Sequence, residues 1–166
     1  MIPLMDLFLM EENQKEYRYS FGEKEVNGCA VLRAPETVVT LLHHRNRKIE
    51  IMAEGEVLMS VPCSRCLAPV ETPVTYSLHR KVDIPTLTDD EEEAVDFIID
   101  EQIDLDLPVR DELLMNFPMR VLCAEDCKGI CVKCGVNLNL HTCACGKEAP
   151  DGPMAGMLKN LKLDIR

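Results

Sequence analysis

The sequence has few aromatic residues. Its 166 residues include no Trp, three Tyr and four Phe. Proteins that bind single-stranded nucleic acid usually stack the bases on aromatic side chains, so this composition argues against that mode of binding. If the chain contacts RNA, basic side chains and backbone groups must supply most of the contacts.

Long hydrophobic runs are also missing. No segment reaches the roughly 18 uncharged apolar residues that a membrane-spanning helix needs. The first ten residues, MIPLMDLFLM, contain Asp6 and lack both a basic start and a small-residue cleavage site, so they do not predict a secretory signal. We therefore expect a cytoplasmic protein without membrane contact, in which cysteines stay reduced.

Familiar catalytic motifs are absent from the sequence. It contains no phosphate-binding loop, no G-x-S-x-G and no H-E-x-x-H pattern. The four His residues lie in settings with no evident carboxylate or nucleophile partner. We expect a protein that is not an enzyme and has no small-molecule substrate.

Charge is unevenly distributed along the chain. The formal net charge is −11, and residues 89–112 contain 12 acidic residues against the single Arg110, which accounts for all of it. This acidic segment is interpreted either as a solvated linker or as a surface that docks a basic partner. Basic residues gather in HHRNRK (43–48), where a solvated turn is the simpler interpretation. The candidate contacts to RNA or a protein partner are Arg45, Arg47, Lys48, Arg65, Lys128 and Lys133.

Cysteine, in contrast, is abundant and concentrated. The tract CAEDCKGICVKCGVNLNLHTCACG (123–146) holds six of the nine cysteines: Cys123, Cys127, Cys131, Cys134, Cys143 and Cys145. In a reducing compartment such a tract favours metal over disulfides. The spacing C-x3-C-x3-C-x2-C-x8-C-x-C does not match the common iron–sulfur patterns. We therefore predict a zinc-binding module.

Four thiols suffice for a tetrahedral zinc site, so the choice among six stays open. Cys131 and Cys134 rank first, because Gly135 follows them and can adopt the positive φ of a tight turn. Cys143 and Cys145 come next, with Cys127 and Cys123 as competitors and His141 as an outside possibility.

A separate C-x-x-C pair, Cys63 and Cys66, has three interpretations. A redox dithiol usually opens a helix, whereas Pro62 and Pro69 flank this pair with extended chain. A structural turn between strands is the leading interpretation. A contribution to a metal or partner site is the second, and a thiol redox enzyme is the third.

Hydrophobic periodicity predicts an α+β fold. The runs CAVLRA, TVVTLLHH, KIEIMAEGEVLMSV and VETPVTYSLHRKVDI, all within residues 26–84, indicate an antiparallel β meander or a partly closed barrel. VDFIID (95–100) predicts a further strand. DLDLPVRDELLMNFP (104–118) predicts a helix whose apolar side carries Leu113, Leu114 and Phe117 and which ends at Pro118. GPMAGMLKNLKLDI (152–165) predicts a short terminal helix.

These elements suggest two units. Residues 1–118 would form a mainly β domain, with the acidic linker 89–112 overlapping its last strand and helix. Residues 119–166 would form the zinc-binding module and the terminal helix. At 166 residues and 46% hydrophobic content, one core plus a small appended module is the natural division.

An ordered set of segments carries a family resemblance. CSRCLAPV, an acidic stretch, IDLDLPVRDELLMNFPMRVLC, CKGICVKCGVNLN and CAC resemble the large ribosomal RNA subunit accumulation protein family (YceD-like), in its version with a cysteine cluster. The resemblance covers residues 63–161. Two positions depart from the family pattern: Val132 replaces the usual Pro of the knuckle, and DGPMAG lacks a frequent Arg.

The resemblance implies a non-enzymatic factor that supports synthesis, processing or stability of large-subunit (23S) ribosomal RNA. It suggests ribosomal RNA or a large-subunit ribosomal protein as the partner. Zinc, the predicted cofactor, rests on the cysteine spacing, because some members of the family lack the cysteine cluster. The alternative function is a zinc-dependent protein-binding adaptor or regulator that does not contact RNA.

Overall fold

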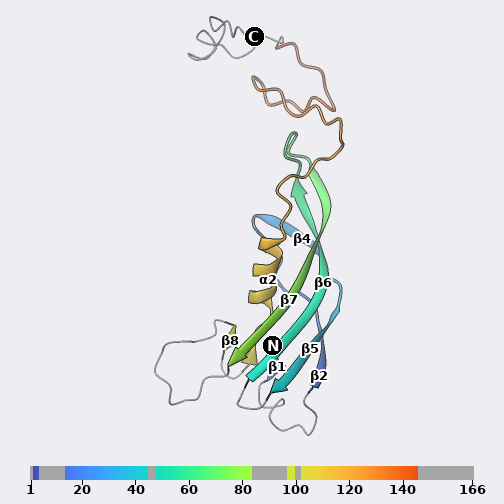
Figure 1. Cartoon of the computed structure of the whole chain (residues 1–166). Helices are drawn as coiled ribbons and strands as arrows, with labels where there is room; N and C mark the ends of the chain where they lie inside the picture. The colour runs from blue at the N-terminus through green and yellow to red at the C-terminus, as the bar shows by residue number, and fades with distance from the viewer. Residues whose placement is uncertain (1, 4–13, 45–47, 84–96, 100–101, 146–166) are drawn as a thin grey trace, which may run out of the picture.

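The protein is an elongated antiparallel β structure with one long hairpin along its axis (Figure 1). The computed structural model describes residues 2–3, 14–44, 48–83, 97–99 and 102–145. The main sheet has the order β2-β5-β6-β4-β3, and β7 pairs with β6. Its strands are β2 (Gln14–Tyr19), β3 (Glu25–Val26), β4 (Cys29–Arg33), β5 (Thr37–His44), β6 (Lys48–Pro62) and β7 (Pro69–Asp83).

The strands β6 and β7 organise the sheet. They pair without interruption from Lys48↔Asp83 to Pro62↔Pro69. At its other edge β6 pairs with β5 over residues 48–53 and with β4 over residues 58–60. The four predicted strand runs are confirmed, but β4 bonds to β6 and not to its sequence neighbour β5. Over the described residues the sheet does not close, so the partly closed barrel is the wrong alternative.

Alternation along β6 decides which face is buried. Every second residue of β6 from Ile49 to Val61 is buried, with Gly55 as the exception. The buried residues of this face are Ile49, Ile51, Ala53, Val57, Met59 and Val61. Because successive side chains in a strand point to opposite faces, this pattern fixes the register of the long hairpin. The buried side chains of β7, Val74, Tyr76, Leu78 and Val82, pair with members of the same set.

A single helix among the described residues covers this buried face. The helix α2 (Asp106–Met115) packs against β7 and β3, with Val109 and Leu113 fully buried. The prediction for Leu113 is therefore confirmed, and Phe117 packs against the core from just beyond the helix. Leu114 is 42% exposed, which makes the prediction for its side chain wrong. The helix ends three residues before Pro118.

Polar contacts hold α2 to the sheet at both ends. Tyr19 Oη donates a hydrogen bond of 2.5 Å to Asp106 Oδ1, and the Gly22 amide donates to the same oxygen. The exposed Arg80 of β7 forms an ion pair of 2.8 Å with Glu112. The helix is therefore anchored to β2 and to β7 by charged groups as well as by its apolar side.

Short strands form a second, smaller sheet. It has the order β1-β9-β8, from β1 (Ile2–Pro3), β8 (Ile98–Ile99) and β9 (Gln102–Ile103). The predicted strand over 95–100 is thus present at Ile98–Ile99. The terminal helix predicted over 152–165 and the acidic run 89–93 lie outside the described residues, as do Arg45 and Arg47. No helix in the described part of the chain is long and apolar enough to cross a membrane.

After α2 the chain runs to the tip of the β6–β7 hairpin and continues beyond it (Figure 1). Residues 119–145 contain turns and one isolated β-bridge, between Ile130 and Asn137. We call this segment the cysteine module. Its buried side chains are few: Val121, Cys127 and Cys131 are the buried apolar residues there. Such a segment has little hydrophobic core of its own.

Candidate metal centre

Eight of the nine cysteines gather into two groups of four. The hairpin group consists of Cys63, Cys66, Cys123 and Cys127, and the module group consists of Cys131, Cys134, Cys143 and Cys145. Within each group all four Sγ atoms lie within 4.8 Å of one another. The ninth cysteine, Cys29, is buried in β4 and belongs to neither group.

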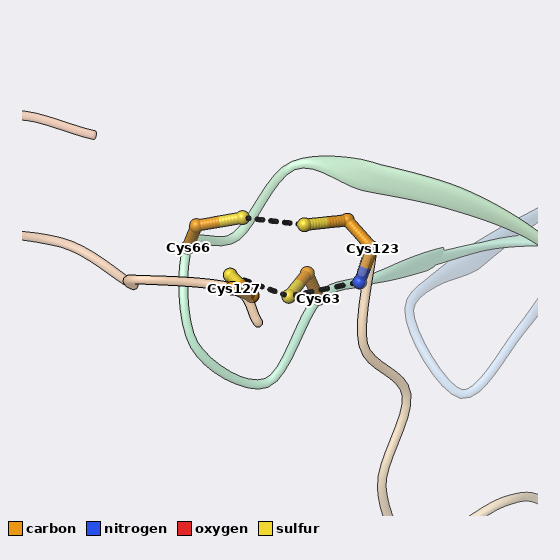
Figure 2. Close-up of side chains that lie close together, drawn as sticks. All are labelled: Cys63, Cys66, Cys123 and Cys127. Atoms are coloured by element: carbon orange, nitrogen blue, oxygen red, sulfur yellow. Dashed lines mark hydrogen bonds between the residues drawn. The ribbon is translucent and has the colours of Figure 1, made fainter. Parts of the chain in front are cut away.

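The sulfur separations in the hairpin group fit a tetrahedral cage (Figure 2). The Sγ atoms of Cys63 and Cys127 are 3.8 Å apart, and those of Cys66 and Cys123 are 3.4 Å apart. Four sulfurs at about 2.3 Å from a central zinc ion would be separated by about 3.8 Å. A disulfide would need about 2.05 Å, and all nine cysteines are free thiols. The donor set and its spacing therefore fit a metal ion.

Both C-x-x-C turns have the same backbone hydrogen bonds. In the first, the Cys63 amide donates to Ala68 O at 2.8 Å, and the Leu67 amide donates to Cys63 O at 3.0 Å. In the second, the Cys131 amide donates to Val136 O and the Gly135 amide donates to Cys131 O, both at 2.8 Å. The two turns are therefore equivalent, although their sequences share only the cysteines.

The residue after each C-x-x-C pair has a positive φ. Gly135 has φ 71°, and Leu67 has φ 61° at the corresponding position. Glycine adopts this region freely, whereas a residue with a Cβ is strained there. The sequence identifies Gly135 as a turn residue by its type, but a Leu at position 67 gives no such signal.

Backbone amides stabilise one thiolate in each group. The N–H groups of Arg65 and Cys66 face Cys63 and lower the pKa of its thiol from 9.0 to about 6. The N–H groups of Cys134 and Lys133 lower the pKa of Cys131 to about 6 in the same way. A thiolate is the form that binds metal, so both turns favour the ligating state.

In each group a different thiol retains its proton. The hydrogen bond with Cys66 raises the pKa of Cys123 to about 12, and the hydrogen bond with Cys134 raises that of Cys145 to about 12. Four thiolates this close repel one another, so full ionisation requires a cation among them. The electrostatics of both groups are thus those of a cation-binding cage.

The structure divides the cysteine tract differently from the sequence interpretation. Cys131, Cys134, Cys143 and Cys145, the first-ranked candidates, do come together. Cys123 and Cys127 are not competitors for that group, because they join Cys63 and Cys66. The C-x-x-C pair at 63–66 forms the turn between β6 and β7 and also belongs to a four-thiol group. His141 is exposed and lies in neither group.

The hairpin group was not predictable as a unit because its members are about 60 residues apart in the sequence. The β6–β7 hairpin carries one pair to its tip, and the chain after α2 carries the other pair to the same place (Figures 1 and 2). The repeated C-x-x-C spacing was a signal for the first pair. Cys123 and Cys127 have a C-x3-C spacing, which suggests no knuckle by itself.

The predicted basic contacts have different roles around these groups. Arg65 Nη1 donates a 2.8 Å hydrogen bond to Cys127 O, so this guanidinium ties the hairpin tip to the module. Lys128 and Lys133 are exposed on the module, whereas Lys48 lies at the opposite end of the hairpin, at the start of β6. The four described candidates, Lys48, Arg65, Lys128 and Lys133, therefore do not form one continuous surface.

Fold and cysteine groups together define an open antiparallel β-sheet protein with two four-thiol groups arranged to hold metal ions. The family model described as "Large ribosomal RNA subunit accumulation protein YceD" matches residues 51–162, so the chain belongs to this family. The match begins within β6 and includes both cysteine groups.

Curated relatives agree with this assignment. An uncharacterized protein of Mycobacterium bovis is 34% identical over 101 residues, which cover 55% of this chain and 49% of the relative. The uncharacterized protein YlbN of Bacillus subtilis is 31% identical over 111 residues, covering 66% and 63% of the two chains. A chloroplastic protein of Arabidopsis thaliana, named large ribosomal RNA subunit accumulation protein YCED homolog 1, is 34% identical over 64 residues, which cover 37% of this chain and 20% of the relative. This chain thus spans about half the length of the mycobacterial relative. No solved structure matches this chain.

Proposed function

We propose that this protein supports the accumulation of large-subunit (23S) ribosomal RNA during ribosome assembly, as a binding factor and not as an enzyme. The observation that carries the proposal is the family match over residues 51–162. Two plant relatives, from Arabidopsis thaliana and Zea mays, are named for large ribosomal RNA subunit accumulation. The place of action would be the cytoplasm, where the ribosomal RNA is made and assembled.

Zinc is the proposed cofactor of the module group. Thiolate ligands favour zinc, copper(I) or iron–sulfur clusters, and a cage of four sulfurs around one point suits a single tetrahedral ion. An iron–sulfur cluster interposes several iron and sulfide atoms between its thiolates and so needs a wider cage. Zinc supplies about 10–16 kcal/mol in small cysteine-rich modules, enough to order a segment with so few buried side chains.

The exposed side chains of the module are the proposed contact surface. Lys128 and Lys133 are positioned beside the two cysteine groups and are exposed, as is Arg65 at the hairpin tip. Basic residues of this kind contact phosphates without base stacking, in keeping with the scarcity of aromatic residues. The partner would be a backbone-exposed region of large-subunit ribosomal RNA.

A depletion experiment tests the proposal. Cells that lack the protein should contain less large-subunit than small-subunit ribosomal RNA, and a plasmid copy of the gene should restore the ratio. The measurement is the ratio of the two RNAs in total RNA during exponential growth. A normal ratio in the depleted cells would contradict the assembly role and leave the zinc-dependent protein adaptor as the better account.

Sedimentation distinguishes an RNA contact from a protein contact. The native protein should cosediment with large-subunit precursors at low salt and leave them as salt rises, because phosphate contacts release counterions. Cosedimentation that survives both salt and ribonuclease would indicate a protein partner instead.

A further inference from the structure

We propose that the hairpin group, Cys63, Cys66, Cys123 and Cys127, is a second zinc site whose ion fixes the cysteine module to the tip of the β6–β7 hairpin. The protein would thus carry two zinc ions with different tasks. The ion in the module group folds the module, and the ion in the hairpin group attaches it. This inference does not depend on the proposed role in ribosomal RNA accumulation.

The geometry of the four thiols carries the proposal. They enter the site from two directions, one pair from the hairpin turn and one from the chain after α2 (Figure 2). Cys63, Cys66 and Cys127 are buried, and the sulfur separations of 3.8 and 3.4 Å match the edges of a zinc–thiolate tetrahedron. Hydrophobic packing alone does not explain why four thiols from two separate segments meet at one point.

The equivalence of the two C-x-x-C turns is an independent argument. The turn at Cys63 has the hydrogen bonds and the positive φ of the turn at Cys131. At position 67 a Leu is held in a conformation that strains it, and that strain has to be offset locally. A metal ion bound by Cys63 and Cys66 offsets it, since the turn presents both thiols to one point.

Hydrogen-bond donors complete the surroundings of the sulfurs. The Cys123 amide donates to Cys63 Sγ at 3.4 Å, and Asn139 Nδ2 donates to Cys127 Sγ at 3.3 Å. Bonds of this kind spread the negative charge of thiolate ligands and orient them. Asn139 lies between Cys134 and Cys143 of the module group in sequence, so its bond to Cys127 links the hairpin site to the module fold.

Direct contacts between hairpin and module surround the same point. Ser64 and Val121 exchange two bonds: the Ser64 amide donates to Val121 O, and the Val121 amide donates to Ser64 Oγ. Gly129, with φ 76°, approaches so closely that an added Cβ would lie 3.1 Å from Arg65 O. Among the described residues, the apolar side chains packed around the thiols are Ala68, Val70 and Leu122. The attachment is thus largely polar, and an ion at its centre supplies what apolar burial does not.

The two sites differ in how they assemble. All four ligands of the module group lie within residues 131–145, so a short segment suffices to bind the ion. The hairpin group joins position 63 to position 127 and requires that the hairpin is already formed. Loss of the hairpin ion should therefore release the module from the sheet and leave the module group occupied.

Metal stoichiometry tests the proposal on the full chain. The purified protein should be colourless and contain two equivalents of zinc, measured by mass spectrometry of the metal. Cys63→Ser/Cys66→Ser should retain one equivalent, and so should Cys131→Ser/Cys134→Ser. The matched control Cys29→Ser removes a buried thiol outside both groups and should retain two. A wild-type protein with one equivalent that Cys63→Ser/Cys66→Ser also retains would overturn the proposal, as would brown protein containing iron.

A second measurement uses the unmodified protein, in case the double variant does not fold. Cys123 is exposed, and without the ion the module should leave the hairpin, so that Cys123 loses its hydrogen bond to Cys66 and should react with iodoacetamide. Bound to zinc, it should be protected until a chelator is added, and mass spectrometry of the peptides reports each cysteine separately. Rapid alkylation of Cys123 in protein that has been saturated with zinc would contradict the second site.

Hydrogen exchange tests the attachment itself. The amides of Ser64 and Val121 bond across the junction and should be protected in wild-type protein. In Cys63→Ser/Cys66→Ser their exchange should accelerate at least tenfold, while the amides of β6 and β7 near Ile51 should be unaffected. Unchanged protection at Ser64 and Val121 would show that the direct contacts suffice without an ion.

Discussion

At the residue scale, the backbone conformation of Leu67 and the pKa of Glu50 depend directly on hydrogen bonds with nearby residues. Asn27 and Leu67 are the non-glycine residues with positive φ in the described ranges, and Asn tolerates this region far better than Leu. The Leu67 side chain is 65% exposed, so packing does not explain its conformation. Its conformation follows from the hydrogen bond that the Leu67 amide donates to Cys63 O, which closes the turn.

Replacing Leu67 by Gly should stabilise the protein. The change relieves roughly 1–2 kcal/mol of backbone strain and costs about 0.5–1 kcal/mol in the entropy of the unfolded chain. We expect a net gain of up to about 1 kcal/mol in the free energy of unfolding, measured by thermal or denaturant unfolding. Leu114→Gly is the control, because Leu114 is also exposed but lies in α2, where Gly should destabilise by about 1 kcal/mol. A destabilised Leu67→Gly would contradict this account of the turn.

Glu50 is the one buried carboxylate among the described residues. Its side chain lies on the face of β6 opposite Ile49 and Ile51 and is bonded on three sides. His79 Nε2 and His44 Nε2 donate to its two oxygens, the latter at 2.9 Å, and Lys81 Nζ lies 3.6 Å away. The bonds from His79 and then His44 lower the pKa of Glu50 from 4.5 to about 2. A carboxyl group with a lowered pKa stabilises the fold fully above its ordinary pKa, and this contribution is lost as pH falls.

Between about pH 4.5 and pH 2 the wild-type protein should therefore lose stability through Glu50. In Glu50→Gln this part of the pH dependence should be absent, and the variant should be less stable at neutral pH. Denaturant unfolding at a series of pH values measures both effects. Glu56→Gln, an exposed position of the same strand, is the control and should preserve the wild-type profile. Identical pH profiles for Glu50→Gln and wild type would rule out this role.

At the element scale, the long hairpin positions the metal centre. Its 15 paired positions carry the turn with Cys63 and Cys66 past the ends of the β5 and β4 pairings with β6, at Ala53 and Ser60 (Figure 1). Halfway along, Gly55 pairs with Tyr76, whose ring lies over the glycine. A Cβ at position 55 would lie 2.6 Å from Tyr76 Cζ, which is closer than two carbon atoms can approach.

Gly55→Ala should accordingly displace the Tyr76 ring from the core. Overpacking of this kind costs about 1–3 kcal/mol of stability, measured by denaturant unfolding. The cost should fall markedly in a Tyr76→Ala background, because the clashing ring is then absent, and this coupling is the decisive observation. Equal costs in both backgrounds would mean that the ring is not what disfavours Ala at position 55.

At the scale of the whole molecule, the sheet and the cysteine module are stabilised by different interactions. The sheet and α2 share one continuous apolar core, from Ile2 to Val121. The module shares a small cluster of Cys63, Cys66 and Cys127 with the hairpin tip and otherwise consists of turns. Its surface also carries exposed apolar side chains, among them Val132 and Leu140. Under the proposed function, bound metal would supply the order that these few buried side chains do not.

If the module binds ribosomal RNA through phosphate contacts, Lys128→Gln/Lys133→Gln should weaken binding evenly across RNA sequences. The slope of log affinity against log salt should shrink by up to about two units, one for each lost contact. Filter binding or fluorescence anisotropy over a salt series measures it. Lys24→Gln, an exposed position between β2 and β3, is the control and should leave the slope unchanged. An unaltered slope in the double variant would place any RNA contact elsewhere.

The sequence alone predicted the strands β4 to β7 and the helix α2, and it suggested a metal-binding chemistry for the module. Alternation along residues 48–62 specified a strand with one buried face, and the spacing of Cys131, Cys134, Cys143 and Cys145 suggested a ligand set within 15 residues. These are local patterns. They can be read from the sequence because the backbone geometry of a strand or a turn fixes which neighbouring residues share a face.

Only the tertiary structure decided what these elements build. It placed β4 beside β6, left the sheet open, and brought Cys63 and Cys66 to Cys123 and Cys127. It also turned Leu114 to solvent, because α2 packs through Val109 and Leu113. Contacts between residues this far apart follow from the length of the hairpin and the path of the chain after α2. No short-range pattern encodes those two quantities, so the hairpin group becomes visible only when the chain is folded.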